Sequence, residues 1–257
     1  MIGDRERTRT VSAIRLRGSA EEIPDEVLVE KRVVLVVDGV EEALVVLTPG
    51  DEGFWALGHL RCRGLIASPE DVEDLKVGEE RVEVFTRRRL RGVPLAQRFM
   101  HTASTGLHGE AKLEPLDVRW SVPASLVLEA VGRLAEGELF RRTGAVHVAL
   151  VCHRGGSPSV MAEDVGRHNA VDKAVGRAMA EGLDLEDCFL AVSGRLPYDM
   201  VLKAAGARLP LLASVSATTL QGIEAARAWG ITLVGFAREG RMNVYSHPER
   251  IEAKPRV

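Results

Sequence analysis

Cysteine is scarce in this sequence. Only Cys62, Cys152 and Cys188 occur among 257 residues, and no two of them are close together along the chain. An odd number at wide spacing excludes a disulfide scaffold. The absence of any Cys-x-x-Cys pair also excludes a dithiol redox centre, a zinc site built from cysteines alone and an iron–sulfur cluster held by four cysteines.

Long apolar runs and an excess of charge of one sign are missing as well. No window approaches the roughly 18 consecutive apolar residues of a membrane-spanning helix, and the charged segment 1–7 has no apolar signal-peptide core. The formal net charge is −3, which argues against a nucleic-acid-binding protein. Hydrophobic residues make up 46% and charged residues 28%, as in ordinary globular proteins. We therefore expect a folded, cytoplasmic protein whose partners are neither membranes nor nucleic acids.

The first part of the chain, residues 1–115, predicts a small α+β domain. Residues 1–26 are charged and show little periodicity, but further on Asp38-Gly39 joins two Val- and Leu-rich segments and is typical of a type I′ hairpin turn. The expected strands of its antiparallel sheet are 27–37, 40–48, 70–76 and 80–86.

A helix is predicted directly after the hairpin. Thr48 is suited to the N-cap, Pro49 to the first helical position and Gly64 to the end of the helix. Three apolar side chains at helical spacing are expected to face the core, namely Phe54, Leu57 and Leu60.

Residues 116–257 show a different rhythm and predict an α/β domain. A helix opens near Pro123, and beyond it strands alternate with helices, which predicts crossover connections and a largely parallel sheet covered on both faces. A last strand, Met242 to Tyr245, is expected to lie antiparallel at an edge. The expected strands are 145–152, 188–193, 210–215 and 231–236, and the expected helices are 166–180, 198–206 and 217–229.

Three segments follow the predicted strands of this domain and could bind an anion. Each combines small residues, hydroxyls or free backbone N–H groups, and two of the three contain arginine, a combination that suits phosphate. Because ligands of open α/β sheets bind at the carboxyl ends of the strands, the segments are expected at one edge. An equally open interpretation makes Ser216 an N-cap and Gly240 a turn residue. The segments are Ser193-Gly194-Arg195, Ser214 to Thr218, and Gly235 to Arg241.

The most concentrated polar run is residues 162–172. Glu163 and Asp164 precede a predicted helix, where acidic side chains favour the N-terminal end of the dipole. His168 and Asp172 are four residues apart on one helical face, so the carboxylate could orient the imidazole. An ordinary capped helix with an ion pair explains the same spacing equally well.

This run resembles a family signature. The segment Glu163-Asp164-Val165-Gly166-Arg167-His168-Asn169-Ala170, followed by Asp172-Lys173, is similar to the signature of the FdhD/NarQ family, the formate dehydrogenase accessory sulfurtransferases. The resemblance extends over residues 27–251. Further matching segments are Thr48-Pro49 with Gly64, Thr143-Gly144-x-x-His147, Ser193-Gly194-Arg195, Val215 to Thr218, and Gly235-Phe236-x-Arg238-x-Gly240-Arg241-x-Asn243-Val244-Tyr245.

The resemblance implies a fold and a role. It implies a cytidine-deaminase-like α/β/α C-terminal domain, a smaller N-terminal α+β domain and a homodimer. Proteins of this family receive sulfur as a persulfide from a cysteine desulfurase and pass it to the molybdenum or tungsten bis(pyranopterin guanine dinucleotide) cofactor, which then enters the formate dehydrogenase apoenzyme. GDP or GTP would mimic part of that cofactor.

The resemblance also suggests which residues bind the cofactor. The guanine-nucleotide contact segment of the family falls on one of the three strand-end segments found above. The residues expected to bind the cofactor are Phe236, Ala237, Arg238, Glu239, Gly240 and Arg241, together with Ser193, Gly194, Arg195, Ser216, Thr218 and His168.

The sequence argues against deaminase chemistry despite the implied fold. Zinc deaminases need His-x-Glu and Pro-Cys-x-x-Cys to activate water. Here His147-Val148-Ala149 lacks the glutamate, and the chain has no Cys-x-x-Cys. No metal site is expected.

The sequence departs from the family in its sulfur-carrying loop. The family loop reads approximately Thr-Ser-Ser-Cys-Gly-x-Cys-Gly, whereas this chain has Thr105 and His108 at the two cysteine positions. Neither side chain can hold a persulfide, which requires a thiolate. Cys152, next to His153, is the candidate for a substitute thiol, although a small apolar residue packed in a sheet fits the same position.

Three hypotheses about function follow. The first is a sulfurtransferase that uses Cys152 or the thiol of a partner. The second is a non-catalytic chaperone that binds and delivers the cofactor without moving sulfur, and the missing loop cysteines favour it. The third is a nucleotide-processing enzyme that uses His168 with Glu163 or Asp164.

Overall fold

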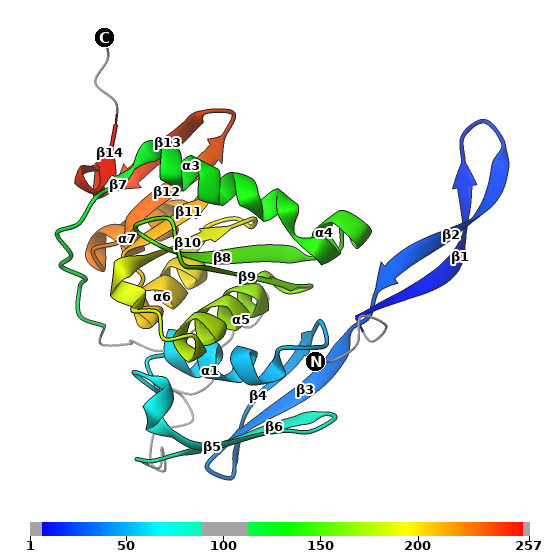
Figure 1. The fold of residues 1–257 in the computed structure, drawn as a ribbon, viewed down its shortest axis with the longest axis horizontal. Coiled ribbons are helices and arrows are strands. Elements are labelled where there is room, and N and C mark those ends of the chain that lie inside the picture. Colours follow the sequence, from blue (N-terminus) through cyan, green and yellow to red (C-terminus); the bar gives the residue numbers. More distant parts are fainter. Residues whose placement is uncertain (1–6, 89–112, 254–257) are drawn as a thin grey trace.

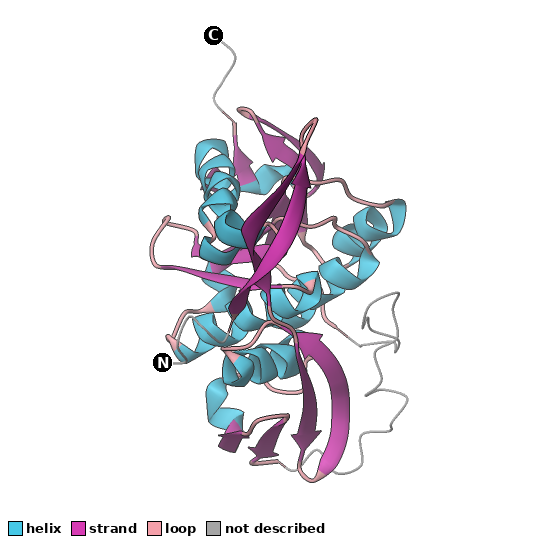
Figure 2. Cartoon of the chain, turned by 90° about the vertical axis from the view of Figure 1, so that its right-hand side faces the viewer, coloured by secondary structure: helices cyan, strands magenta, loops and turns pink. Residues whose placement is uncertain are grey.

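The computed structural model describes residues 7–88 and 113–253. The loop of Thr105 and His108 therefore lies outside the described residues. The chain forms a mixed α/β structure in which a six-stranded and a four-stranded sheet lie at opposite sides of a helical layer (Figures 1 and 2). In the described part of the chain, no helix is both long and apolar enough to cross a membrane.

The four-stranded sheet matches the predicted strands closely. Its order is β4-β3-β6-β5, and the predicted antiparallel arrangement holds for every pair except β3 with β6, which are parallel. Asp38 and Gly39 have φ angles of 51° and 83°, so the predicted type I′ turn is confirmed. The strands are β3 (Lys31–Val37), β4 (Val40–Leu47), β5 (Val72–Val77) and β6 (Arg81–Thr86), with the short helix η2 (Pro69–Asp71) before β5.

Residues 7–26 are more regular than their composition indicated. Most of them belong to a two-stranded hairpin, β1 (Thr8–Leu16) with β2 (Ala20–Leu28), that pairs with no other described strand. We call this hairpin the arm, because it projects from the body of the molecule (Figure 1). The arm is exposed on both faces, so neither face needs apolar residues. Its sequence therefore lacks the clear alternation of apolar and polar residues that predicts a strand.

The predicted helix begins later than expected. Helix α1 (Glu52–Cys62) has Asp51 as its N-cap, not Thr48, and Phe54 and Leu57 are only half-buried. The helix does end beside Gly64, as predicted. Trp55 and Leu60 are fully buried, since α1 lies between the four-stranded sheet and helix α5 (Arg167–Ala180). The prediction is confirmed for Leu60 and holds only in part for Phe54 and Leu57, because a helix covered on both sides has no single apolar stripe.

The six-stranded sheet is mixed, and the prediction of a largely parallel sheet is wrong. Its order is β13-β12-β11-β10-β8-β9, and only β10–β11 and β11–β12 are parallel. An unpredicted strand, β9, returns antiparallel to β8, so the helical crossover that follows leads to β10 on the far side of β8. The strands are β8 (His147–His153), β9 (Ser159–Asp164), β10 (Cys188–Val192), β11 (Leu211–Ser214), β12 (Thr232–Arg238) and β13 (Arg241–Ser246).

Helices cover both faces of this sheet, as predicted. Along β8, Val148, Leu150 and Cys152 pack toward α3, whereas Ala149 and Val151 pack on the α5 side. The helices are α3 (Ala124–Gly132), η3 (Arg133–Glu136), α4 (Glu138–Thr143), α5 (Arg167–Ala180), η4 (Leu185–Asp187), α6 (Tyr198–Ala207), α7 (Leu220–Ala228) and η5 (Pro248–Arg250). A small parallel pair, β7 (Val122–Pro123) with β14 (Ile251–Glu252), joins the two ends of this part.

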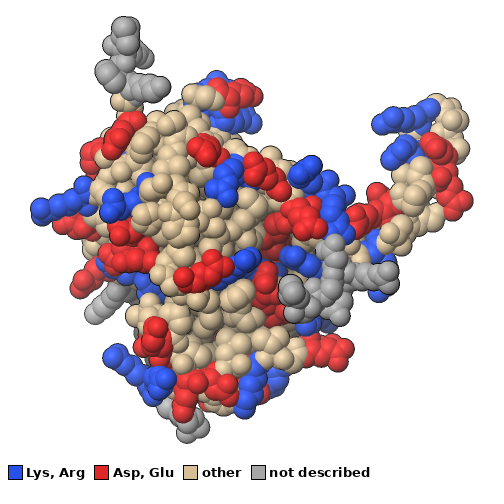
Figure 3. Space-filling model, in the orientation of Figure 1, with Lys and Arg blue, Asp and Glu red and all other residues tan. Residues whose placement is uncertain are grey.

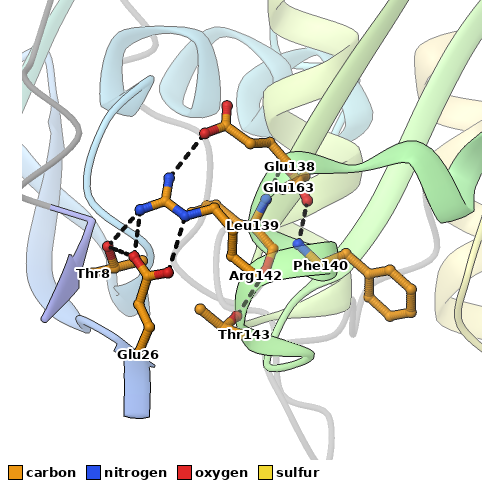
Figure 4. A network of polar contacts seen from close by, with 8 residues as sticks. All are labelled: Thr8, Glu26, Glu138, Leu139, Phe140, Arg142, Thr143 and Glu163. Atoms are coloured by element: carbon orange, nitrogen blue, oxygen red, sulfur yellow. Dashed lines mark hydrogen bonds and ion pairs between the residues drawn. The ribbon is translucent and has the colours of Figure 1, made fainter. Parts of the chain in front are cut away.

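A polar network holds the base of the arm against α4 (Figure 4). The guanidinium of Arg142 donates to Glu26 at 3.2 Å, to the Thr8 hydroxyl at 3.0 Å and to Glu138 at 2.8 Å. Glu163, at the end of β9, accepts hydrogen bonds from the Leu139 and Phe140 backbones at the start of α4. The direction of the arm is thereby tied to the edge of the six-stranded sheet.

The surface has no extended area of one charge on the face shown in Figure 3. Basic and acidic side chains are interspersed over this face. The arm itself carries both signs, because its first strand contains arginines and its second strand contains carboxylates.

Candidate functional site

The strand-end segments predicted from the sequence lie together at one edge of the six-stranded sheet. Backbone and side-chain contacts join them in sequence across the strands: the Ser214 hydroxyl donates to the Gly194 carbonyl at 2.6 Å, and the Phe236 amide donates to the Ser216 carbonyl at 3.0 Å. Because β8 is antiparallel to β10, its first residue, His147, lies at this same edge. We call this end of the sheet, where the strand-end segments and His147 lie, the signature edge.

The segment after β11 does not provide a helix start. The N-cap of α7 is Thr219, whose side chain accepts from the Gly222 amide at 3.1 Å, so the interpretation of Ser216 as an N-cap is wrong. Thr218 donates its hydroxyl to the Leu196 carbonyl at 2.9 Å and thus ties this segment to the loop after β10. Because Thr219 is the N-cap, the observed helix α7 (Leu220–Ala228) is shorter than the predicted helix 217–229.

The segment Phe236 to Arg241 is the tip of a hairpin. Strand β12 continues to Arg238, two residues beyond its predicted end, and Glu239 and Gly240 form the turn with φ angles of 54° and 74°. The expected turn role of Gly240 is confirmed. Phe236 has a φ of 53° at a β-bulge, and its side chain is exposed. Arg238 and Arg241 are exposed, whereas Ala237 is buried.

A cavity of about 320 Å³ opens beside this hairpin tip. Its floor includes Ser193 and residues 237–240, and its opposite wall is apolar because α3, η3 and α4 contribute Leu128, Val131, Leu134 and Phe140. An apolar wall facing a few polar groups is the ordinary composition of a small-molecule site, and a flat heteroaromatic ring fits such a wall. We call it the apolar pocket.

His168 does not pair with Asp172, and that prediction is wrong. The His168 imidazole Nε2 lies 2.9 Å from Asp199 Oδ2, on the next helix along the chain. Burial lowers the pKa of His168, although the Asp199 carboxylate opposes this effect. Asp172 is instead 2.5 Å from Lys203 Nζ and 3.4 Å from His59 Nδ1. Both side chains thus find partners on α6, and Asp172 reaches α1 as well.

Asp199 is a residue that the sequence analysis missed. It lies in the first turn of α6, directly after the Ser193-Gly194-Arg195 segment, where an acidic side chain is expected as a helix-start residue. Only the packing of α6 against α5 identifies it as the partner of His168.

Several signature residues join the two sheets of the protein. Lys173 Nζ lies 2.7 Å from Asp164 Oδ2 and donates to the Thr48 carbonyl at 2.6 Å. The Thr48 hydroxyl accepts from the Val165 amide at 3.0 Å, and Asn169 donates to the Val46 carbonyl at 2.9 Å. Part of the signature therefore has a structural role, because these residues hold the two sheets together. Glu163 accepts hydrogen bonds from the start of α4, and Asp164 pairs with Lys173, so neither carboxylate is the partner of His168.

The three cysteines are all described, and all are buried. Burial raises the pKa of Cys152 to about 11 and that of Cys188 to about 12, and it raises the pKa of Cys62 as well. Cys152 packs toward α3, and its thiol lies 3.5 Å from the His153 carbonyl. A nucleophilic thiol needs exposure and a lowered pKa, so the site of Cys152 is that of a packing residue.

Comparison with known proteins defines the class of this chain. A crystal structure from Desulfotalea psychrophila, described as that of a formate dehydrogenase accessory protein, shares the fold with a TM-score of 0.79, covering 96% of this chain and 100% of that chain at 24% identity. The family model described as "FdhD/NarQ family" matches residues 28–252.

Individual relatives agree with that match. The sulfur carrier protein FdhD of Anaeromyxobacter dehalogenans strain 2CP-C is 38% identical, with 89% of each chain covered. The protein of the same name from Saccharolobus solfataricus is 36% identical, with 81% of this chain and 83% of the relative covered. The chain belongs to the FdhD/NarQ family.

Proposed function

We propose that this protein binds a molybdenum or tungsten bis(pyranopterin guanine dinucleotide) cofactor at the signature edge and delivers it to a formate dehydrogenase apoenzyme. The observation that carries the proposal is the apolar pocket beside the arginine-bearing hairpin tip. The accessory role named for the Desulfotalea psychrophila protein, and the carrier role named for the relatives, support the same pathway.

The residues present fit such a cargo. Phe236, Arg238 and Arg241 are exposed beside the apolar pocket, and Arg195 is exposed on the neighbouring loop. Guanidinium groups form forked, charge-assisted hydrogen bonds with phosphate oxygens. The apolar wall would hold a guanine or pterin ring, and the arginines would hold the diphosphate that carries it. The metal belongs to the cargo.

We further propose that delivery needs no persulfide on this chain. The three thiols are buried with raised pKa values, and Thr105 and His108 occupy the positions of the family cysteines. Any sulfur added to the cargo would then be carried by a thiol of the cysteine desulfurase. Direct transfer through Cys152 is the competing mechanism, and the relatives' name of sulfur carrier is what favours it.

Calorimetric titration with GDP tests the binding site. The double variant Arg238→Ala/Arg241→Ala should bind GDP at least about tenfold more weakly than the wild type, since it loses charge-assisted hydrogen bonds. Arg81→Ala, which removes a half-exposed arginine from β6, is the matched control and should bind normally. Equal GDP affinity in all three proteins would refute the assigned site.

Sulfur loading tests the mechanism. After incubation with a cysteine desulfurase and cysteine, the intact mass of the protein should be unchanged, because a persulfide would add about 32 Da. The matched positive control is Thr105→Cys/His108→Cys, which restores both family cysteines and should gain the adduct. An adduct on the wild-type chain that disappears in Cys152→Ala would establish the competing mechanism.

The remaining expectations about this protein are also proposals. A sheet with helices on both faces supports the cytidine-deaminase-like architecture for residues 116–257, with residues 1–115 as the smaller domain. A homodimer and a cytoplasmic location follow from the family resemblance. Sedimentation of the purified protein would test the homodimer directly.

A further inference from the structure

A second cavity, of about 270 Å³, lies at the signature edge on the side of β4. Val45 and Val46 of β4 form one wall, and residues 165–169, which lead into α5, form the other. His147, the first residue of β8, completes the lining. We call it the basic pocket, because Arg167 and two histidines, His147 and His168, contribute to it.

Arg167 has unused hydrogen-bond donors in this pocket. Its only ion pair among the described residues is with Asp199, at 3.6 Å, which is longer than a hydrogen bond. Its Nε is buried and has no partner within the part of the chain that the structure describes. A buried donor without a partner costs free energy, so an arginine in this state is suited to an acceptor from a ligand.

His147 and Ser193 lie next to this arginine. The His147 Nδ1 is 3.4 Å from the Ser193 hydroxyl, which also accepts a hydrogen bond from the Val148 amide at 3.0 Å. Gly194 lies beside both Arg167 and His147: a Cβ there would be in ordinary van der Waals contact with the two side chains, 3.5 Å from the Arg167 Cδ and 3.6 Å from His147 Nδ1. The three side chains therefore converge from β8, from the loop after β10 and from α5.

The nearby carboxylates are already engaged. Asp199 is bound by His168 and by the Met200 amide at 2.8 Å. Asp164 is bound by Lys173 and by the Gly166 amide at 2.8 Å. The groups left to meet a ligand are thus donors, and the pocket favours an anion over a cation.

We propose that Arg167, His147 and Ser193 form a binding site for a tetrahedral oxyanion, with phosphate as the representative ligand. The guanidinium would supply forked donors, and the imidazole and hydroxyl would bind further oxygens. Ser193 lines the apolar pocket, and His147, 3.4 Å from its hydroxyl, lines the basic pocket, so the two cavities are neighbours. The oxyanion is either a phosphate group of the cargo or a free inorganic anion. Only the first of these sources rests on the proposed function.

The imidazole provides a direct readout. Burial lowers the pKa of His147, and the nearby Arg167 cation lowers it further. A bound anion would favour the protonated ring and raise this pKa. In a phosphate-free buffer, NMR titration of the seven histidines, with His147→Gln to assign the signal, should show the pKa of His147 rising when inorganic phosphate is added.

Variants then test the arginine. Arg167→Gln should bind inorganic phosphate about tenfold or more weakly, the loss expected for charge-assisted hydrogen bonds. Arg154→Gln is the matched control, since Arg154 is exposed and paired with Asp187 away from the pocket. An unchanged His147 pKa in wild-type protein saturated with phosphate, or wild-type phosphate affinity in a folded Arg167→Gln variant, would overturn the proposal.

GDP separates the two sources of the anion. If phosphate and GDP both raise the His147 pKa and compete, the cargo phosphate occupies the basic pocket. If phosphate raises it and GDP does not bind at all, the oxyanion site stands while the proposed function fails. If GDP binds through Arg238 and Arg241 and neither ligand affects His147, the proposed function stands and the oxyanion site is refuted.

Discussion

Gly58 of α1 and Gly176 of α5 lie in direct backbone contact. A Cβ on Gly58 would come within 1.8 Å of the Asp172 carbonyl oxygen, and one on Gly176 within 1.9 Å of the Phe54 carbonyl oxygen. Gly206 of α6 approaches Cys62 in the same way, with 2.0 Å from its Cβ position to the carbonyl oxygen. Helix α1 therefore packs on the other part of the chain at backbone distance, and no side chain larger than hydrogen fits at these positions.

Alanine at this contact should destabilise the protein. Gly58→Ala or Gly176→Ala forces the two helices apart, and overpacking of this kind costs about 1–3 kcal/mol or more. Urea unfolding, followed by circular dichroism, measures the change in the free energy of unfolding. The control is Gly132→Ala at the end of α3, where a Cβ meets nothing within 4 Å, and it should be neutral or slightly stabilising. Equal midpoints for Gly58→Ala and Gly132→Ala would contradict the contact.

A buried ion pair lies beside these glycines and predicts non-additive mutations. Lys203 Nζ is 2.5 Å from Asp172 Oδ1, and the two side chains are 2% and 1% exposed. Lys203→Met leaves the carboxylate buried without its cation and should cost about 3–5 kcal/mol. The double variant Lys203→Met/Asp172→Leu should be more stable than Lys203→Met, because it removes both charges. If urea unfolding shows that the double variant loses as much free energy of unfolding as Lys203→Met and Asp172→Leu together, the pair is not coupled.

Stability should fall as the pH drops below about 6.5, the unfolded pKa of histidine. Burial lowers the pKa values of His59 and His168 in the folded protein. The unfolded chain therefore takes up protons that the folded chain resists, and stability declines with falling pH by up to about 1.4 kcal/mol per pH unit for each histidine.

A histidine variant provides the check on this pH dependence. His59→Gln should have a shallower decline between pH 7 and 5 than the wild type, as measured by thermal unfolding across buffers. The Asp172 pKa acts in a separate window: burial raises it, but the Lys203 cation and the His59 hydrogen bond outweigh burial and lower it. Its contribution is lost only as the pH falls below about 4. If the stability of the wild type and that of His59→Gln decline equally between pH 7 and 5, His59 does not have this role.

The arm should loosen when its anchor is removed. The hydrogen bonds from Arg142 and Thr8 lower the pKa of Glu26 to about 2, which means that these contacts stabilise its charged form. Isolated two-stranded hairpins are only marginally stable. In Glu26→Gln, hydrogen exchange should accelerate in β1 and β2 and stay unchanged in the sheets. Glu21→Gln, in the exposed outer part of the arm, is the control and should exchange like the wild type. Wild-type exchange in Glu26→Gln would show that the arm has another anchor.

Local patterns in the sequence correctly predicted most elements. The alternation of strands and helices after residue 116, the Asp38-Gly39 turn and the turn at Gly240 are properties of short segments. The signature around His168 similarly predicted the family, since it is a contiguous run of residues. Strand β9 and the arm were missed, because one is a short edge strand and the other has no buried face.

The tertiary structure decided which residues meet. Spacing along one helix suggested that His168 and Asp172 would pair, but helix packing gives them Asp199 and Lys203 as partners, contributed by α6. Thr48 had the composition of an N-cap, yet its hydroxyl accepts a hydrogen bond from Val165, 117 residues away. Contacts at such separations depend on how elements pack, which local preference does not determine.

The sequence by itself determined the family and the lack of suitable thiols. The replacement of both loop cysteines by Thr105 and His108 is a fact of composition, and no fold can supply a thiolate at those positions. Only the tertiary structure decided that Cys152 is buried behind α3 and that His147, Arg167 and Ser193 converge. The reason is physical: reactivity and binding depend on burial and on neighbours in space, and the six-stranded sheet brings these distant segments to one edge.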